Sequence, residues 1–173
     1  QADLNDDAMR IMQDISFTIG KAGDGAPNRR TPVGVSIFAA EASSSSPRIT
    51  FFYDDVGNTP DPQMSADDLW MWYSLSNGRI LHVLFRTGNW TAIAPAVLID
   101  SRTLKLSDGV AITTLEFSFY TSGTAGSPDP IMTIDSYAAS YVRVHMELGK
   151  SATSLSKDSW IHLTNVLNAR QLP

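Results

Sequence analysis

Three histidines, His82, His145 and His162, carry the most versatile side-chain chemistry in this sequence. Each falls within a segment with the pattern of a β-strand, and no two have the spacing of a metal-ligand pair. We therefore interpret them as surface residues or as hydrogen-bonded residues of the core. The chain has no cysteine, which excludes disulfides, cysteine-ligated metals and a cysteine nucleophile.

Motifs that identify common enzyme mechanisms are missing from the sequence. It contains no G-x-S-x-G elbow, no P-loop, no dinucleotide-binding glycine pattern and no H-E-x-x-H. Two carboxylates that face each other across a cleft could cleave glycosides, but a sequence does not show such a pair. We expect no catalytic residues and no enzymatic activity, and keep an acid-catalysed hydrolase as a third hypothesis.

Acidic side chains gather in the turn-rich segment that follows Tyr53. Carboxylate and amide oxygens on a glycine-containing loop are suitable Ca²⁺ ligands, but the order D-D-V-G-N differs from the alternating pattern of an EF-hand. We interpret the segment as a solvated acidic loop and expect no cofactor, with Ca²⁺ as the alternative. The candidate ligands are Asp54, Asp55 and Asn58, and the other aspartates of the segment are Asp61, Asp67 and Asp68.

Trp70, Trp72 and Tyr73 form an aromatic cluster at strand spacing. Aromatic residues in such a pattern usually belong to a core or a sheet face, although they could also stack on sugars. A carbohydrate-binding or adhesin β-sandwich that uses Trp70, Trp72 or Trp90 is therefore the alternative function.

Nucleic-acid binding is not expected, because the net charge is −5 and no basic run is present.

The elements that position these residues begin with an amphipathic helix over Leu4–Ala22. Apolar residues recur at steps of three and four, and Gly20 and Gly23 supply the stop. The start lacks a clear cap, so we expect the helix to continue upstream. The apolar face comprises Leu4, Ala8, Ile11, Ile15, Ile19 and Ala22, and the polar face comprises Asp6, Asp7, Arg10, Gln13, Asp14 and Lys21.

The remainder of the chain has the pattern of eight or nine short strands. The strongest signal is Asn77-Gly78 between two β-rich runs, because both residues of such a hairpin turn must adopt positive φ. We expect Glu41–Pro47 and Gly149–Lys157 to be loops. The predicted strands are Val33–Ala40, Arg48–Tyr53, Leu69–Leu75, Arg79–Phe85, Ala96–Ile99, Arg102–Leu106, Ala111–Tyr120, Tyr137–Leu148 and Asp158–Val166.

One helix followed by sequential strands predicts an α+β fold with antiparallel sheets and no parallel βαβ units. We expect a single domain over residues 1–173, because 173 residues suit one domain. It would contain a long helix over residues 1–23, a variable loop and strand over 24–47, and an antiparallel β region over 48–173.

Five segments in this order resemble the soluble domain of type IV pilin-like proteins, most closely the J-type minor pseudopilins of type II secretion and the related W-type minor pilins. The first resembles the exposed half of the pilin spine helix, and the third resembles the hairpin of this family. The segments are AMRIMQDISFTIGKAG (8–23), ITFFYDDVGN (49–58), WYSLSNGRILHVL (72–84), PAVLIDSRTLKLSDGVAITTLEFSFYTSG (95–123) and YVRVHMELGKSATSLSKDSWIHLTNVLNAR (141–170).

The resemblance implies a pilin-like fold and an assembly function at the tip of a pseudopilus or type IV pilus, where minor subunits prime filament assembly for protein secretion. Its implied partners are other minor subunits, the major subunit and the inner membrane, reached through an apolar, N-methylated half-helix upstream of this sequence. The implied location is the bacterial inner membrane with this domain in the periplasm, or a pilus tip. On the helix, we expect Asp6, Arg10, Gln13 and Asp14 to contact neighbouring subunits.

Overall fold

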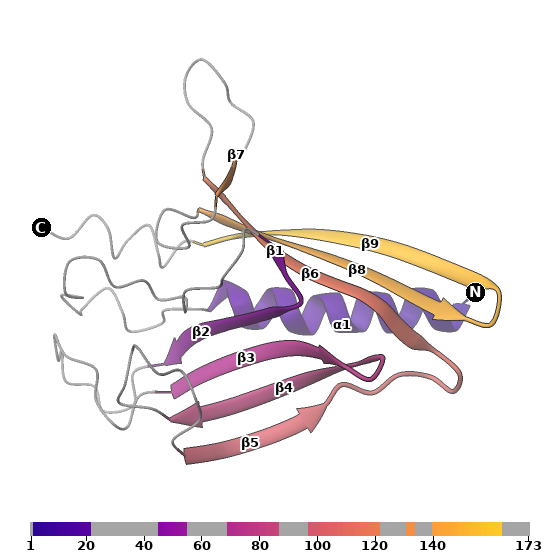
Figure 1. The fold of residues 1–173 in the computed structure, drawn as a ribbon, viewed down its shortest axis with the longest axis horizontal. Coiled ribbons are helices and arrows are strands. Elements are labelled where there is room, and N and C mark those ends of the chain that lie inside the picture. Colours follow the sequence, from indigo (N-terminus) through magenta and orange to yellow (C-terminus); the bar gives the residue numbers. More distant parts are fainter. Residues whose placement is uncertain are drawn as a thin grey trace, which may run out of the picture.

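The structure is a computed structural model and contains one helix, α1, followed by strands that form two antiparallel sheets among the described residues (Figure 1). Helix α1 spans Ala2–Gly20, which confirms the predicted helix with a shift of two residues at each end. The α+β fold class is also confirmed. The described residues are 2–21, 45–54, 69–86, 97–121, 131–133 and 140–163.

Within the described ranges, sheet A has four strands in the order β2-β3-β4-β5, so each strand pairs with its neighbour in the sequence. Figure 1 shows this sheet on one side of α1 and the second sheet on the other. The strands of sheet A are β2 (Arg48–Asp54), β3 (Leu69–Ser76), β4 (Arg79–Arg86) and β5 (Val97–Thr103).

Sheet B has five strands in the part of the chain that the structure describes, with β1, β6, β8 and β9 in that order and β7 paired to the end of β6. Strand β6 pairs with β8, and β8 pairs with β9 along their full lengths. The strands of sheet B are β1 (Ser45–Ser46), β6 (Ala111–Thr121), β7 (Ile131–Thr133), β8 (Tyr141–Lys150) and β9 (Thr153–His162).

The apolar stripe of α1 forms the centre of the core, as its period of three and four predicts. Ala8, Ile11, Ile15 and Ile19 have no exposed surface, and Leu4 is almost fully buried. These residues join one cluster with inward-facing residues of both sheets. Burial of apolar surface on this scale is the main force that holds a helix against sheets.

The predicted hairpin is confirmed between β3 and β4. Asn77 has φ 50° and Gly78 has φ 70°, so both turn residues have the positive φ that the Asn-Gly sequence suggests. The carbonyl of Gly78 accepts a hydrogen bond of 2.8 Å from the Ile112 N–H at the start of β6. The turn therefore also ties sheet A to sheet B.

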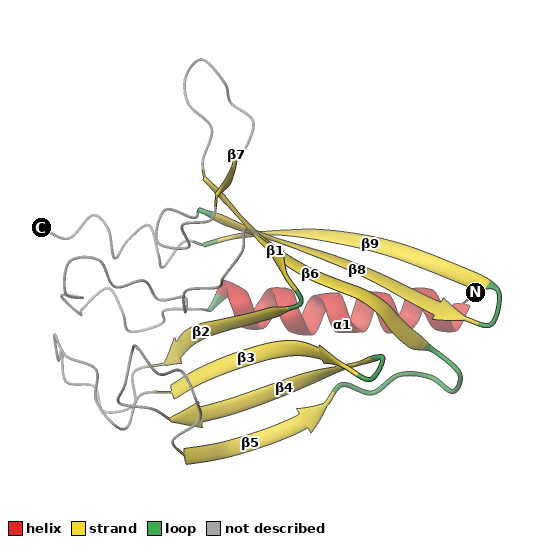
Figure 2. Ribbon diagram, viewed as in Figure 1, coloured by secondary structure: helices red, strands yellow, loops and turns green. Residues whose placement is uncertain are grey.

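The strands of sheet B have the expected inward and outward alternation. Along β8, Val142, Val144, Met146 and Leu148 are buried, and the residues between them are partly exposed. The loop from Leu104 to Val110, green in Figure 2, connects β5 of sheet A to β6 of sheet B. Its Leu104 N–H donates to the Ile80 carbonyl at 2.9 Å, which anchors this crossing between the sheets.

Several predicted boundaries are wrong. Residues 153–157 form the first half of β9 instead of a loop, because pairing with β8 fixes this polar segment after a turn at Ser151 and Ala152. Strand β5 joins most of the predicted strand at 96–99 to the beginning of the one at 102–106 through Asp100 and Ser101, and residues 104–106 belong to the following loop.

Two very short strands were not expected. Strand β1 lies within the predicted loop 41–47 and pairs with Ser118 and Phe117, and β7 pairs with residues 119–121. Such two- and three-residue strands exist because a long neighbour, β6, offers free backbone groups, and no local pattern marks them. The predicted strand Val33–Ala40 lies outside the described residues.

Candidate interaction surface

The solvent-facing side of α1 carries two large apolar residues, Met9 and Phe17. Their exposed fractions are 59% and 67%, which is high for residues of this size on a helix whose other side is buried. With Asp6 and Gln13, both exposed, they form a surface that we call the outward face of α1. The Lys21 ammonium lies 4.3 Å from the centre of the Phe17 ring and borders this face.

Of the four residues expected to contact other subunits, Asp6 and Gln13 belong to the outward face. Arg10 lies at its border, with 49% of its side chain exposed, and forms an ion pair of 2.9 Å with Asp7. It also donates to the backbone carbonyl of Lys105 in the loop between the sheets. Arg10 therefore connects α1 to the loop between the sheets and also exposes part of its side chain to solvent.

Asp14 instead connects α1 to sheet A. Its Oδ1 atom accepts a hydrogen bond of 2.8 Å from the Tyr73 hydroxyl, and its Oδ2 atom lies 3.3 Å from Nη2 of Arg102. Asp14 and Arg102, with Arg10 and Leu104, border a hollow of about 430 Å³ between α1 and the end of β5. Asp14 has a structural role in these contacts, and 29% of its side chain stays exposed.

The prediction that Asp7 lies on the exposed polar face of the helix is wrong, because its exposed fraction is only 4%. It accepts a 2.7 Å hydrogen bond from the Ser107 N–H as well as the ion pair from Arg10. Burial acts to raise the pKa of Asp7, but these hydrogen bonds outweigh it, and the pKa lies below the ordinary value. The carboxylate therefore anchors the loop between the sheets to the first half of α1.

His82 lies beside this network as a buried residue with its hydrogen bonds satisfied, which agrees with the interpretation of the histidines. Its Nδ1 atom accepts from Nε of Arg102 at 3.3 Å, and Nε2 faces the sulfur of Met71. Its ring packs against Tyr73 with centroids 4.9 Å apart. Burial, and then the Arg102 charge, lower the pKa of His82, so the neutral ring is favoured. Burial also raises the pKa of Tyr73.

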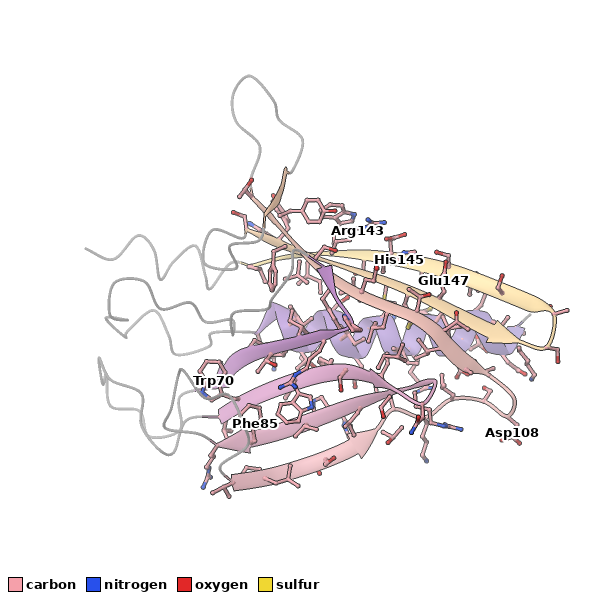
Figure 3. The ribbon with its side chains drawn as sticks, in the orientation of Figure 1. Trp70, Phe85, Asp108, Arg143, His145 and Glu147 are labelled. Carbon is pink, nitrogen blue, oxygen red and sulfur yellow. The ribbon has the colours of Figure 1, made fainter. Side chains whose placement is uncertain are left out.

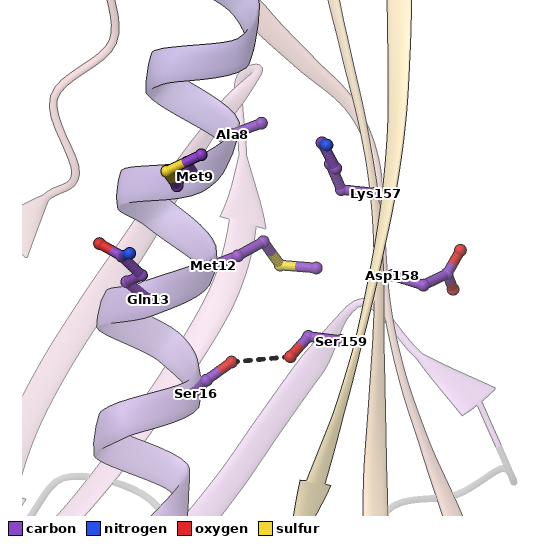
Figure 4. A pocket seen from close by; sticks show the side chains of 8 residues that line it. All are labelled: Ala8, Met9, Met12, Gln13, Ser16, Lys157, Asp158 and Ser159. Atoms are coloured by element: carbon purple, nitrogen blue, oxygen red, sulfur yellow. Dashed lines mark hydrogen bonds between the residues drawn. The ribbon is translucent and has the colours of Figure 1, made fainter.

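A groove of about 270 Å³ separates the other side of α1 from β9 (Figure 4). Ser16 and Ser159 bridge it through a 2.9 Å hydrogen bond between their hydroxyls. Figure 4 shows Met12 pointing into the space between the helix and the strand, and Asp158 pointing away from the helix. The groove is continuous with the outward face, because Met9 and Gln13 line both.

His145 lies on the outer face of sheet B in a set of charged neighbours (Figure 3). Its Nδ1 is 3.2 Å from Oδ1 of Asp158, which also receives an ion pair of 2.6 Å from Arg143. Across the described ranges, no group of three or more histidine and acidic side chains could hold a metal ion. Asp54 ends strand β2, and the other two candidate Ca²⁺ ligands, Asp55 and Asn58, lie outside the described residues.

Of the two tryptophans of sheet A, Trp70 is a core residue and Trp72 is partly buried against the core. Trp70 is 1% exposed, and Trp72 packs on Phe85 with ring centroids 4.9 Å apart. The Arg48 guanidinium covers the Trp72 ring at 4.3 Å. A sugar could not stack on the buried ring of Trp70, and Trp90 lies outside the described residues.

Sequence reasoning missed Met9 and Phe17 as functional candidates. The signal that could have found them is that apolar residues recur eight positions apart, at 9 and 17, on the side of the helix opposite the core stripe.

Within the described part of the chain, no helix is long and apolar enough to span a membrane. Comparisons with protein-family models, with curated proteins and with solved structures found no match for this chain.

Proposed function

We propose that this chain is the soluble domain of a structural assembly subunit with a pilin-like fold, a J-type minor pseudopilin of type II secretion or a related W-type minor pilin. The resemblance of five ordered sequence segments suggests this class. One N-terminal helix packed against two antiparallel sheets is compatible with it. The proposal includes the inner-membrane and periplasmic or pilus-tip location, and other minor subunits and the major subunit as partners.

The observation that carries the proposal is the outward face of α1. Met9 and Phe17 stay exposed although the same helix already buries a full apolar stripe in the core. An apolar surface bordered by Asp6 and Gln13 suits a protein contact, because burying it against a neighbour gains free energy without unfolding either partner. Subunits of a filament need such non-closing contacts along one side.

The test uses the soluble domains of the minor subunits encoded beside this one. We expect a complex by light scattering and calorimetry, and we expect the Phe17→Ser variant to raise its Kd by about tenfold or more. Met9→Ser should act in the same direction. Val97→Ser is the matched control, since Val97 is also an exposed apolar residue, at 54%, but lies on β5.

Two results would contradict the proposal in different ways. If no complex forms with any neighbouring minor subunit at concentrations well above micromolar, the assembly function itself is wrong. If a complex forms but Phe17→Ser and Met9→Ser bind as tightly as the unmodified domain, the outward face of α1 is not the contact surface. Far-ultraviolet circular dichroism of each variant controls for its folding.

A further inference from the structure

Strand β5 is an exposed edge of sheet A with an apolar beginning. It pairs with β4 on one side, and no strand in the described part of the chain pairs with its other side. All seven residues from Val97 to Thr103 are exposed. Val97, Leu98 and Ile99 have exposed fractions of 54%, 58% and 43%.

An edge of this kind is a template for another strand. Its outward N–H and C=O groups are available for pairing, and exposed aliphatic side chains favour burial against an added chain. A β-bulge at Ile99, where the pairing with β4 shifts register, interrupts the edge at its apolar end. Beyond it, Asp100–Thr103 pairs regularly with Leu81–Leu84, so this half of β5 has the regular backbone that strand addition requires.

The charges of β5 indicate which strand fits. Asp100 and Arg102 lie two residues apart and point to the same face of sheet A, because side chains alternate along a strand. Arg102 keeps 53% of its side chain exposed beside Asp14. A carboxylate and a guanidinium at this spacing are complementary to the same pair running in the opposite direction.

We propose that a second copy of this chain pairs antiparallel with β5, with Ser101 opposite Ser101 of the second copy. Each Asp100 then faces Arg102 of the other copy, which gives two opposite-charge cross-strand pairs related by a two-fold axis. Ile99 faces Thr103 of the other copy, and the two A sheets become one continuous sheet.

The neighbouring registers are disfavoured by the same charges. A two-fold axis through Asp100 sets the two aspartates opposite each other, and an axis through Arg102 does the same with the two arginines. An axis through Ile99 sets Leu98 opposite Asp100. Only the axis through Ser101 pairs opposite charges, so electrostatics selects the register within this strand.

This inference stands apart from the proposed function. It uses one edge of sheet A, whereas the assembly proposal uses the outward face of α1. A monomeric domain would overturn the β5 pairing and leave the assembly proposal intact, and a failure to bind other minor subunits would do the reverse.

The experiment is sedimentation equilibrium of the purified domain over a range of concentrations, with charge-reversal variants. The unmodified domain should form a dimer, and Asp100→Arg and Arg102→Asp should each raise the dimer dissociation constant by about tenfold or more, because each sets like charges opposite. An equimolar mixture of these two variants should dimerise again, since every facing pair is then of opposite sign. Asp108→Arg, on the exposed loop after β5, is the matched control with the same charge change.

Arg102 also contacts His82 and Asp14, so Arg102→Asp could fail to fold. Leu98→Lys is the second variant, because Leu98 is 58% exposed and its replacement puts a charge on the edge without removing a core contact. It should also weaken the dimer. A domain that stays monomeric at every concentration, or a dimer that neither Asp100→Arg nor Leu98→Lys weakens, would overturn the proposal.

Discussion

The hydroxyl of Tyr73 joins sheet A to α1 through a hydrogen bond to Asp14, beside Thr18 of the same helix, and Tyr73→Phe removes this hydroxyl. Tyr73 has no exposed surface, and its hydroxyl donates to Oδ1 of Asp14 at 2.8 Å. A hydrogen bond to a charged group contributes about 1.5–3 kcal/mol to stability. Asp14 keeps Arg102 as a partner and is 29% exposed, so water can replace part of the lost donor. We expect Tyr73→Phe to reduce the free energy of unfolding by about 1–2 kcal/mol.

Urea unfolding followed by tryptophan fluorescence measures this change, and a double-mutant cycle with Asp14→Ala assigns it to the pair. The cycle should give a coupling energy of about 1 kcal/mol, because the two side chains touch. Tyr141→Phe, at a partly buried position on sheet B, is the matched control and should change stability by less than about 0.5 kcal/mol. An unchanged urea midpoint for Tyr73→Phe, or an equal loss in the Asp14→Ala background, would refute the reasoning.

Three further perturbations test the core and the turns. Asp7→Ala should reduce the free energy of unfolding by about 1–3 kcal/mol. Because the pKa of Asp7 is lowered in the folded state, its carboxylate contributes stability at pH values above the unfolded pKa of 3.8, and this contribution is lost as the pH falls through the folded pKa. The variant should therefore lose less stability at acid pH than the unmodified domain, and urea unfolding at several pH values measures both effects. The pKa of His82 lies below 6.5, so stability should fall as pH drops below 6.5, and an assigned His82 resonance that titrates at or above 6.5 in NMR would contradict this. Gly78→Ala should reduce stability by about 1–2 kcal/mol in thermal unfolding, because Gly78 has φ 70° and the added Cβ would lie 3.3 Å from Ala111. Gly20→Ala is the control and should be nearly neutral or stabilising, because nothing lies within 4 Å of its added Cβ. Equal effects of the two variants would show that alanine is not strained in the turn.

The outward face of α1 and the β5 edge give this chain two separate surfaces for association. The first carries Met9 and Phe17, and the second carries three aliphatic residues from Val97 to Ile99. Because a helix side and a strand edge recognise partners by different means, a neighbour that uses one does not require the other. Variants at Phe17 and Leu98 should therefore affect different complexes.

Local physical rules in the sequence were sufficient for several elements. The period of α1 identified Ile11, Ile15 and Ile19 as core residues because a helix repeats its faces every 3.6 residues whatever it packs against. The Asn77-Gly78 turn followed from the few residues that tolerate positive φ. The inward face of β8 followed from strict alternation, which works wherever one side of a strand is buried.

Other features depend on residues that are distant in the sequence. Asp7 is a charged residue at a helix position predicted to face solvent. It is buried because Ser107, in the loop between the sheets, supplies a hydrogen bond to its carboxylate. The first half of β9 is polar and has no strand pattern, and β8 makes it a strand by offering a complete row of pairing partners. Propensity gives no information about such partners, since they are a property of the assembled sheet.

The candidate surfaces divide in the same way. The sequence by itself determined that α1 is amphipathic and that Asp6 and Gln13 lie on its polar side. Only the tertiary structure decided that Asp14 turns to Tyr73 and that, among the described residues, Met9 and Phe17 stay exposed and β5 is an edge of sheet A. The physical reason is that a residue's own type and spacing set its face of a helix or strand, whereas its contacts depend on which distant elements pack against that face.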